Sequence, residues 1–124
     1  MCFVCGVENA FGMHARFLDV EGGEVVCLFT PSEQHQGYPG RLHGGLAAAV
    51  IDETIGRAIS LDEPDTWYVT IELTTRYRKP VPLGEQLRAV GRITSESARA
   101  FEASGEILLA DGTVAVEATG RYLK

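Results

Sequence analysis

The sequence lacks several features that would mark a membrane, secreted or multidomain protein. No stretch approaches the ~20 consecutive apolar residues that cross a bilayer, and the first residues lack the basic region and apolar run of a secretory signal. It has no internal repeat, no low-complexity tract and no linker rich in proline, glycine and serine. A chain of 124 residues has room for one domain. We therefore expect a single cytoplasmic domain over residues 1–124.

Metal-binding residues are also scarce. Three cysteines in a chain without an export signal argue against a disulfide framework. Cys2 and Cys5 have the spacing of half a zinc site, but a closed structural site needs a second pair of ligands. The histidines at 14, 35 and 43 are not spaced as such a pair. We expect no metal and no cofactor, and small apolar roles for the two N-terminal cysteines.

Charge and hydropathy exclude two further classes. Seventeen acidic against eleven basic residues give a net charge of −6. Nucleic-acid affinity comes largely from clustered basic side chains that neutralise phosphates, so this balance argues against a nucleic-acid partner. Hydrophobic residues make up 45% of the chain, which is too many for an open, disordered chain and enough for a core.

The pattern of apolar residues predicts two strands, one helix and four strands, in that order. The expected strands are 14–20, 24–30, 67–79, 87–93, 99–109 and 113–123, and the expected helix is 44–60. Gly22-Gly23 marks a short hairpin, 31–42 a turn-rich loop, and Asp111-Gly112 a two-residue turn. One helix must then cover one face of an antiparallel sheet, which is an α+β architecture.

The first turns of the expected helix are apolar in unbroken succession from Leu46 to Ile51. A helix that is apolar all round is buried all round. A single sheet cannot wrap it completely, so we expect a partner subunit to help cover it.

The two acids of this helix point in different directions on a helical wheel. Glu53 and Arg57 have the i,i+4 spacing of an ion pair, which predicts a solvated or interfacial role for Glu53. Asp52 shares its face with small or apolar residues, namely Ala48, Ala49, Ile55, Gly56 and Ile59. A lone buried carboxylate is costly. Two interpretations of Asp52 stay open: a structural acid satisfied by a nearby hydroxyl or amide, and a functional acid.

The start of the helix adds a second candidate feature. His43, Gly44 and Gly45 lie where unsatisfied backbone N–H groups and the positive end of the helix dipole accumulate. Glycine there lets an oxygen of another molecule approach the backbone. Such a site suits a bound anion or the oxyanion of an acyl transfer.

Three segments resemble the hotdog-fold acyl-CoA thioesterases, most closely the PaaI-like group related to 4-hydroxybenzoyl-CoA thioesterase. The most specific is 37–53, GYPGRLHGGLAAAVIDE; the second is 74–84, TTRYRKPVPLG; and the third is 2–12 at the N-terminus. The resemblance implies a sheet wrapped around one long central helix. It also implies a homodimer or homotetramer, in which two sheets pair edge to edge and the active sites lie at the dimer interface.

The resemblance further implies hydrolysis of an acyl-CoA thioester to a free acid and coenzyme A. Asp52 corresponds to the acid that acts as general base or nucleophile, and Thr70 to a hydroxyl that supports it. The backbone amides of Gly44 and Gly45 correspond to the group that polarises the thioester carbonyl, with His43 beside it. Coenzyme A is then part of the substrate, and no separate cofactor is implied.

Substrate-binding candidates are less specific. Some members of the family have a second polarising amide side chain where this chain has Gly37, so the adjacent Gln36 is a candidate. The basic candidates for the phosphates of coenzyme A are Arg41, Arg76, Arg78 and Lys79. For Tyr38 and Trp67 we expect packing in the core or an interface, with lining of the acyl site as the alternative. Two other functions stay open: a hotdog hydratase or dehydratase, and a non-catalytic acyl-CoA sensor.

Overall fold

A computed structural model describes residues 4, 6, 12–20 and 22–124. The strands and helices follow the predicted order. They are β1 (Arg16–Val20), β2 (Glu24–Phe29), the 3-10 helix η1 (Glu33–His35), α1 (Gly44–Gly56), the 3-10 helix η2 (Arg57–Leu61), β3 (Val69–Tyr77), β4 (Leu87–Glu96), β5 (Ala100–Leu108) and β6 (Val114–Leu123).

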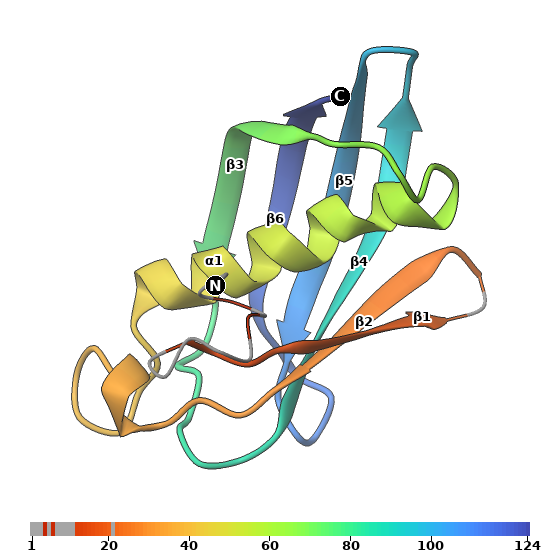
Figure 1. Ribbon diagram of the computed structural model, residues 1–124. Coiled ribbons are helices and arrows are strands. Elements are labelled where there is room, and N and C mark those ends of the chain that lie inside the picture. The colour runs from red at the N-terminus through yellow and green to blue at the C-terminus, as the bar shows by residue number, and fades with distance from the viewer. Residues whose placement is uncertain (1–3, 5, 7–11, 21) are drawn as a thin grey trace.

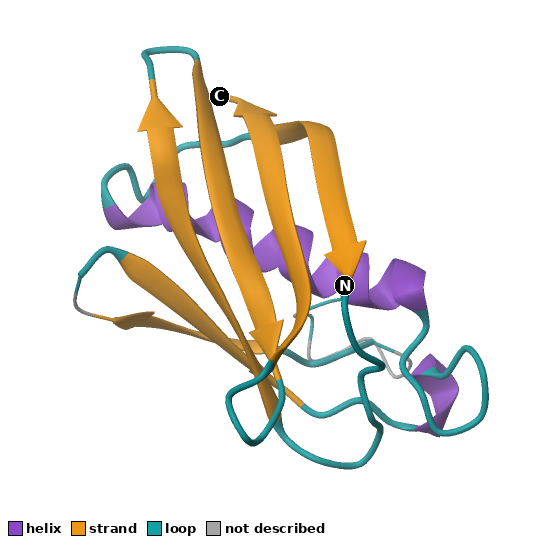
Figure 2. Ribbon diagram, turned by 180° about the vertical axis from the view of Figure 1, so that it is seen from behind, coloured by secondary structure: helices purple, strands orange, loops and turns teal. Residues whose placement is uncertain are grey.

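The six strands form one sheet in the order β1-β2-β4-β5-β6-β3, and every neighbouring pair is antiparallel. The helix α1 runs across one face of β3 to β6, while the β1–β2 hairpin diverges from the other strands and passes under the helix (Figures 1 and 2). The expected α+β architecture is confirmed. In this order β3 lies at one edge of the sheet and β1 at the other.

Two local predictions were wrong. The α-helix ends at Gly56, and the chain continues to Leu61 as a tighter 3-10 helix. Glycine is a poor helix former, so the α-helical ladder stops there. The hairpin between β5 and β6 has a three-residue turn rather than a two-residue one, because Leu109 N–H donates to Thr113 O at 2.9 Å and encloses residues 110–112.

The helix lies unusually close to the middle of the sheet. Gly91 of β4 and Gly105 of β5 are directly paired beneath Ile55. A Cβ atom at Gly91 would lie 2.8 Å from Ile55 Cα, and one at Gly105 would lie 2.5 Å from Ile55 Cγ2. The absence of these side chains therefore sets how deeply α1 lies against the sheet.

Only one stripe of α1 is fully buried within a single copy of the chain. Ala47, Val50, Ile51, Thr54 and Ile55 are buried, whereas other apolar residues of the first turns are half-buried. These half-buried residues are Leu46, Ala48 and Ala49. The expectation of burial on all sides is therefore not met within one copy. In the described part of the chain, no helix is long and apolar enough to cross a membrane.

Candidate active site

Asp52 points toward the inner face of the sheet and is held there by hydroxyl groups. Thr70 Oγ1, on β3, lies 3.1 Å from Asp52 Oδ1 and 3.0 Å from Oδ2. Tyr122 Oη, on β6, donates to Asp52 Oδ1 at 2.9 Å. Among the described residues, no cation lies within ion-pair distance of this carboxylate. The neighbouring Glu53 is instead paired with Arg57 at 3.3 Å, as its spacing predicts.

Tyr122 contacts Asp52 but was not among the predicted site residues. Its side chain is fully buried, and its hydroxyl contacts Asp52 across 70 positions of sequence. Burial, and then the nearby carboxylate, raise the pKa of the Tyr122 phenol well above its ordinary value. A signal was present, because alternation along 114–123 places Tyr122 on the inner face, and a buried tyrosine hydroxyl needs a partner.

At the start of α1, the side chain of His43 caps the helix. His43 Nδ1 accepts a hydrogen bond from Gly45 N–H at 2.9 Å. This bond places the ring proton of neutral His43 on Nε2 and occupies the Gly45 amide. The expectation that both glycine amides polarise a carbonyl is therefore not met at Gly45. In the described structure, Gly44 N–H has no acceptor and is the amide available to a ligand.

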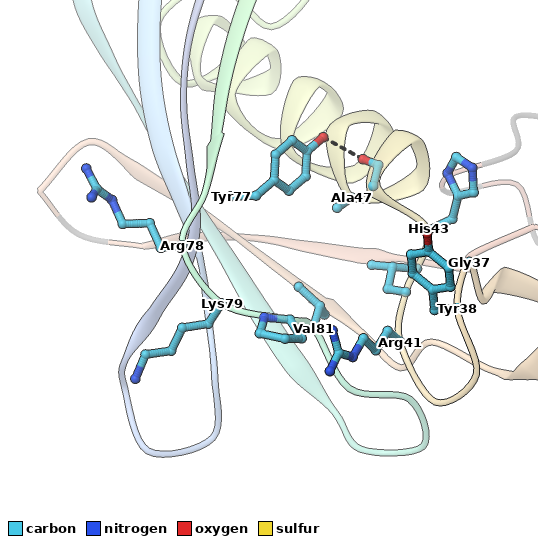
Figure 3. Close-up of a pocket in the computed structure, with 12 residues that line it drawn as sticks. Gly37, Tyr38, Arg41, His43, Ala47, Tyr77, Arg78, Lys79 and Val81 are labelled. Atoms are coloured by element: carbon cyan, nitrogen blue, oxygen red, sulfur yellow. Dashed lines mark hydrogen bonds between the residues drawn. The ribbon is translucent and has the colours of Figure 1, made fainter.

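A groove of about 680 Å³ opens beside this helix start (Figure 3). Tyr77 forms one side, where its hydroxyl donates to Gly44 O at 2.6 Å. The groove is lined by residues of two segments, 37–47 and 77–81. Asp52 and Thr70 are not among its lining residues, so this groove and the carboxylate cluster are separate within one copy.

The distance between these two parts follows from helix geometry. Gly44 and Asp52 are eight positions apart on α1, which at ~1.5 Å per residue is about 12 Å. A thioester carbonyl within hydrogen-bond distance of Gly44 N–H is therefore out of reach of Asp52 in the same copy.

The other candidate residues divide into two groups. Tyr38, Arg41 and Lys79 line the groove, and Tyr38 is 81% exposed, which excludes packing in the core of one copy. Arg78 also lines the groove, but its guanidinium pairs with Glu117 at 2.6 Å.

Gln36 lies outside the groove lining, and its side chain accepts a hydrogen bond from Gly40 N–H across the turn that follows it. Trp67 is 91% exposed, which excludes packing in the core of one copy and leaves the expectation of packing in an interface as a prediction. Cys2 and Cys5 lie outside the described residues. Among those that are described, no group of three or more potential ligands could hold a metal.

Comparison with known proteins places these features in a family. The family model described as Thioesterase superfamily matches residues 39–116, which include the start of α1, Asp52 and Thr70. The chain belongs to this superfamily. Its architecture is the hotdog fold, shared with solved structures of thioesterase superfamily proteins.

Two relatives illustrate the match. The chain is 33% identical over 113 residues to the acyl-coenzyme A thioesterase THEM4 of Xenopus laevis, covering 90% of this chain and 50% of that protein. The crystal structure of another thioesterase superfamily protein is 34% identical, with a TM-score of 0.87 over 96% of this chain and 61% of its own. The chain spans between about a third and just over half of the curated relatives that it matches.

A more distant structure, the PaaI protein of E. coli from the phenylacetic acid degradation operon, shares the fold. It is 16% identical, and its TM-score is 0.81 over 90% of this chain and 80% of its own.

Proposed function

We propose that the protein hydrolyses acyl-CoA thioesters at a site shared by two copies of the chain, with Asp52 as the reacting carboxylate. The observation that carries this proposal is the environment of Asp52. Neutral hydroxyl groups hold it in place, and no cation of the described structure compensates its charge. An acid that is oriented in this way and has no ion-pair partner can accept a proton or attack a carbonyl.

The exposed edge of the sheet supports the shared site. Along β3 and its approach, Trp67, Val69, Ile71 and Tyr77 are each at least half exposed. A nine-residue strand with unpaired backbone groups and apolar side chains is suited to pairing with another strand. A second copy of β3 is the occupant we propose, because the two copies would then form one continuous sheet related by a two-fold axis.

Antiparallel pairing of two β3 strands would also bring Asp52 of one copy close to Gly44 of the other, which are too far apart within one copy. The beginning of one strand, which carries Thr70 and contacts Asp52, lies beside the end of the other. That end carries the partner's Tyr77, which contacts the partner's Gly44. Asp52 of one copy therefore faces the groove of the other, and the homodimer is the smallest active unit.

The chemistry then follows from these positions. The thioester carbonyl accepts a hydrogen bond from the partner's Gly44, and Asp52 either removes a proton from an attacking water or attacks the carbonyl carbon itself. In the second route a mixed anhydride forms and water then opens it. The carbonyl electron pair moves to oxygen, where the amide stabilises it; one such donor is worth ~3 kcal/mol of barrier. Collapse expels the thiolate of coenzyme A, whose conjugate thiol has an ordinary pKa near ~8.5, so no general acid is needed.

Basic residues at the groove would hold the phosphates of coenzyme A. Arg41 and Lys79 line the groove, and neither forms an ion pair within the described structure. Arg78 is the weaker candidate, because Glu117 already compensates its charge. Electrostatic attraction of this kind strengthens substrate binding without taking part in bond breaking.

The direct test is hydrolysis of a panel of aliphatic and aromatic acyl-CoA thioesters by the wild type, Asp52→Asn and Glu53→Gln. We expect Asp52→Asn to lower kcat/KM by about 100- to 10,000-fold, the range for loss of a general base. Glu53→Gln is the matched control, with an adjacent acid on another helix face, and should stay near the wild type. A wild type that binds acyl-CoA without turnover would instead favour a non-catalytic sensor.

A complementation experiment tests the shared site. Gly44→Pro removes the amide at the first helical position, where proline is tolerated, and Gly44→Ala keeps the amide as a control. Asp52→Asn and Gly44→Pro should each be inactive alone. Refolded as a 1:1 mixture, they should regain about a quarter of wild-type activity, because half of the dimers then hold one intact site. No recovery on mixing would show that each copy works alone.

A further inference from the structure

We propose that Tyr122 is a positioning residue for Asp52. Its buried hydroxyl fixes the carboxylate so that Oδ2 is the oxygen presented to the reacting water or carbonyl. This inference rests on the proposed thioesterase function and adds to it the residue that determines which carboxylate oxygen reacts.

The hydrogen bonds around Asp52 are unequal on its two oxygens. Tyr122 Oη lies 2.9 Å from Oδ1 and 3.4 Å from the backbone oxygen of Asp52. A phenol has one proton, and the shorter contact to a charged acceptor takes it. Thr70 Oγ1 is nearly equidistant from both carboxylate oxygens and also donates one proton. Oδ1 therefore has two potential donors and Oδ2 has one that it shares, so Oδ2 keeps the more available lone pairs.

The ring of Tyr122 is held firmly enough to act as a positioning group. It is fully buried, stacks on Phe101 with ring centroids 4.8 Å apart, and meets Tyr68 edge to face at 5.6 Å. Such packing restricts the ring to one rotamer. Tyr122 is also paired directly with Thr70 across the β3–β6 ladder, next to an irregularity in β3 between Thr70 and Glu72. The sheet thus supplies both hydroxyls from adjacent positions.

Gly120 provides the space that the hydroxyl occupies. A Cβ atom at this position would lie 2.6 Å from Tyr122 Oη, closer than side-chain atoms pack. Both residues face the inner side of β6, two positions apart. A larger residue at 120 would therefore displace the hydroxyl while leaving the tyrosine itself in the chain.

The test compares two variants that each remove one buried hydroxyl. Tyr122→Phe keeps the packed ring, and we expect kcat to fall about 10- to 100-fold with KM changed less than about threefold, as for a lost hydrogen bond to a charged group. Thr54→Val is the control, since its buried hydroxyl donates to Val50 O at 2.7 Å and does not contact Asp52. Its kcat should stay near wild type. Gly120→Ala should lower kcat in the same way as Tyr122→Phe.

A readout without turnover checks the contact itself. The 13C resonance of the Asp52 carboxyl carbon should move in Tyr122→Phe and stay in place in Thr54→Val. If Asp52→Asn is inactive but folded Tyr122→Phe keeps wild-type kcat, this inference is wrong and the proposed function stands. If the wild type hydrolyses no thioester, both are wrong.

Discussion

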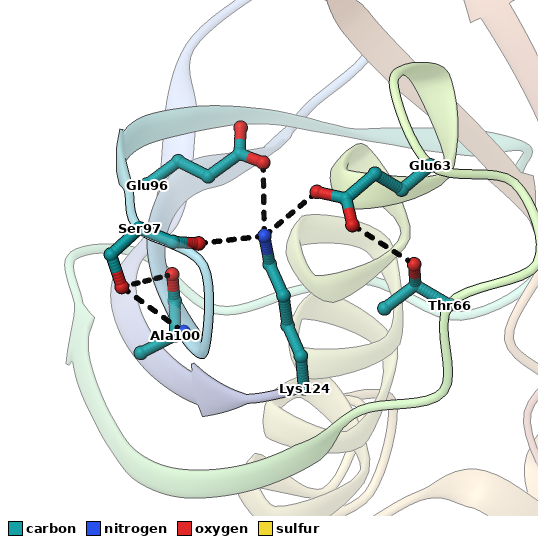
Figure 4. A network of polar contacts seen from close by, with 6 residues as sticks. All are labelled: Glu63, Thr66, Glu96, Ser97, Ala100 and Lys124. Carbon is teal, nitrogen blue, oxygen red and sulfur yellow. Dashed lines mark hydrogen bonds and ion pairs between the residues drawn. The ribbon is translucent and has the colours of Figure 1, made fainter.

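Two carboxylate clusters lie close to the end of β6 and differ in what holds them. In the first, the hydroxyls of Thr70 and Tyr122 hold Asp52. In the second, Lys124 donates to a carboxylate oxygen of Glu63 at 2.7 Å and to one of Glu96 at 3.0 Å (Figure 4). The same ammonium also donates to Ser97 O at 2.8 Å, and the Lys124 side chain is only 9% exposed. We call this second cluster the Lys124 latch.

The two clusters differ in the charge of the groups that hold their acids, and this difference suits one cluster to catalysis and the other to stability. In the Lys124 latch, hydrogen bonding to Lys124 lowers the pKa of Glu63, and bonding to Glu63 raises the pKa of Lys124. The ammonium compensates part of the charge of the two acids, and the latch ties the end of β6 to β4 and to the loop before β3. Asp52 has neutral donors instead, which fix its orientation without cancelling its charge. Its charge therefore remains available to a substrate.

The largest effect should come from giving Asp52 the cation that it lacks. Thr70→Lys would place an ammonium beside the Asp52 carboxylate, so that a cation would hold this acid as Lys124 holds Glu63. We expect kcat to fall about 100- to 10,000-fold while the protein stays folded, because a carboxylate in an ion pair is a weaker base. Thr70→Ser keeps the hydroxyl and should retain most of the activity in the same assay. Comparable rates for the two variants would contradict the role of uncompensated charge.

A smaller effect, on stability alone, should follow from removing the ammonium of the Lys124 latch. Lys124→Met leaves two acids close together without their partner, so we expect a lower thermal unfolding midpoint at pH 7 and a kcat close to the wild type. Arg121→Met is a control, since its ion pair with Glu102 is exposed and long at 3.4 Å; its midpoint should barely change. An unchanged midpoint in Lys124→Met would show that the latch does not stabilise the fold.

The smallest effect to measure is the pH dependence of that stabilisation. The lowered pKa of Glu63 contributes stability above its ordinary value of 4.5, and this contribution is lost as the pH falls through the folded-state pKa. The raised pKa of Lys124 contributes below 10.5, and its contribution is lost as the pH rises. The difference in midpoint between wild type and Lys124→Met should thus be largest near neutral pH and shrink toward both extremes. A constant difference would assign the effect to packing.

Local patterns predicted most of the fold. Strand alternation, the glycine turn at residues 22–23 and the apolar run after Gly45 reproduce the order of strands and helix, because each is encoded within a few neighbouring residues. The direction of Asp52 followed from helix periodicity in the same way. The hairpin was mispredicted, because strand pairing stops one residue earlier than a two-residue turn requires: Leu109, and not Ala110, bonds to Thr113.

Two of the contacts that were missed at the site are non-local, and the third is local. Tyr122 meets Asp52 only because β6 lies between β5 and β3, which no short segment reveals. Arg78 is paired with Glu117 because β3 and β6 are neighbouring strands in the sheet. The occupation of the Gly45 amide by His43 depends on one side-chain rotamer, which sequence spacing does not specify.

The close approach of α1 to Gly91 and Gly105 has a consequence for the superfamily. The position of the Asp52 carboxylate depends on the absence of a Cβ atom at Gly91 and at Gly105, which lets α1 lie close to the sheet. A side chain at Gly91 would push the helix outward and move the carboxylate away from its two hydroxyls, and one at Gly105 would clash both with Ile55 of the helix and with the backbone oxygen of Val90 in β4. A relative could then retain every residue of the helix motif and still hold its acid out of range, so these two glycines belong beside the motif when hydrolytic competence is judged.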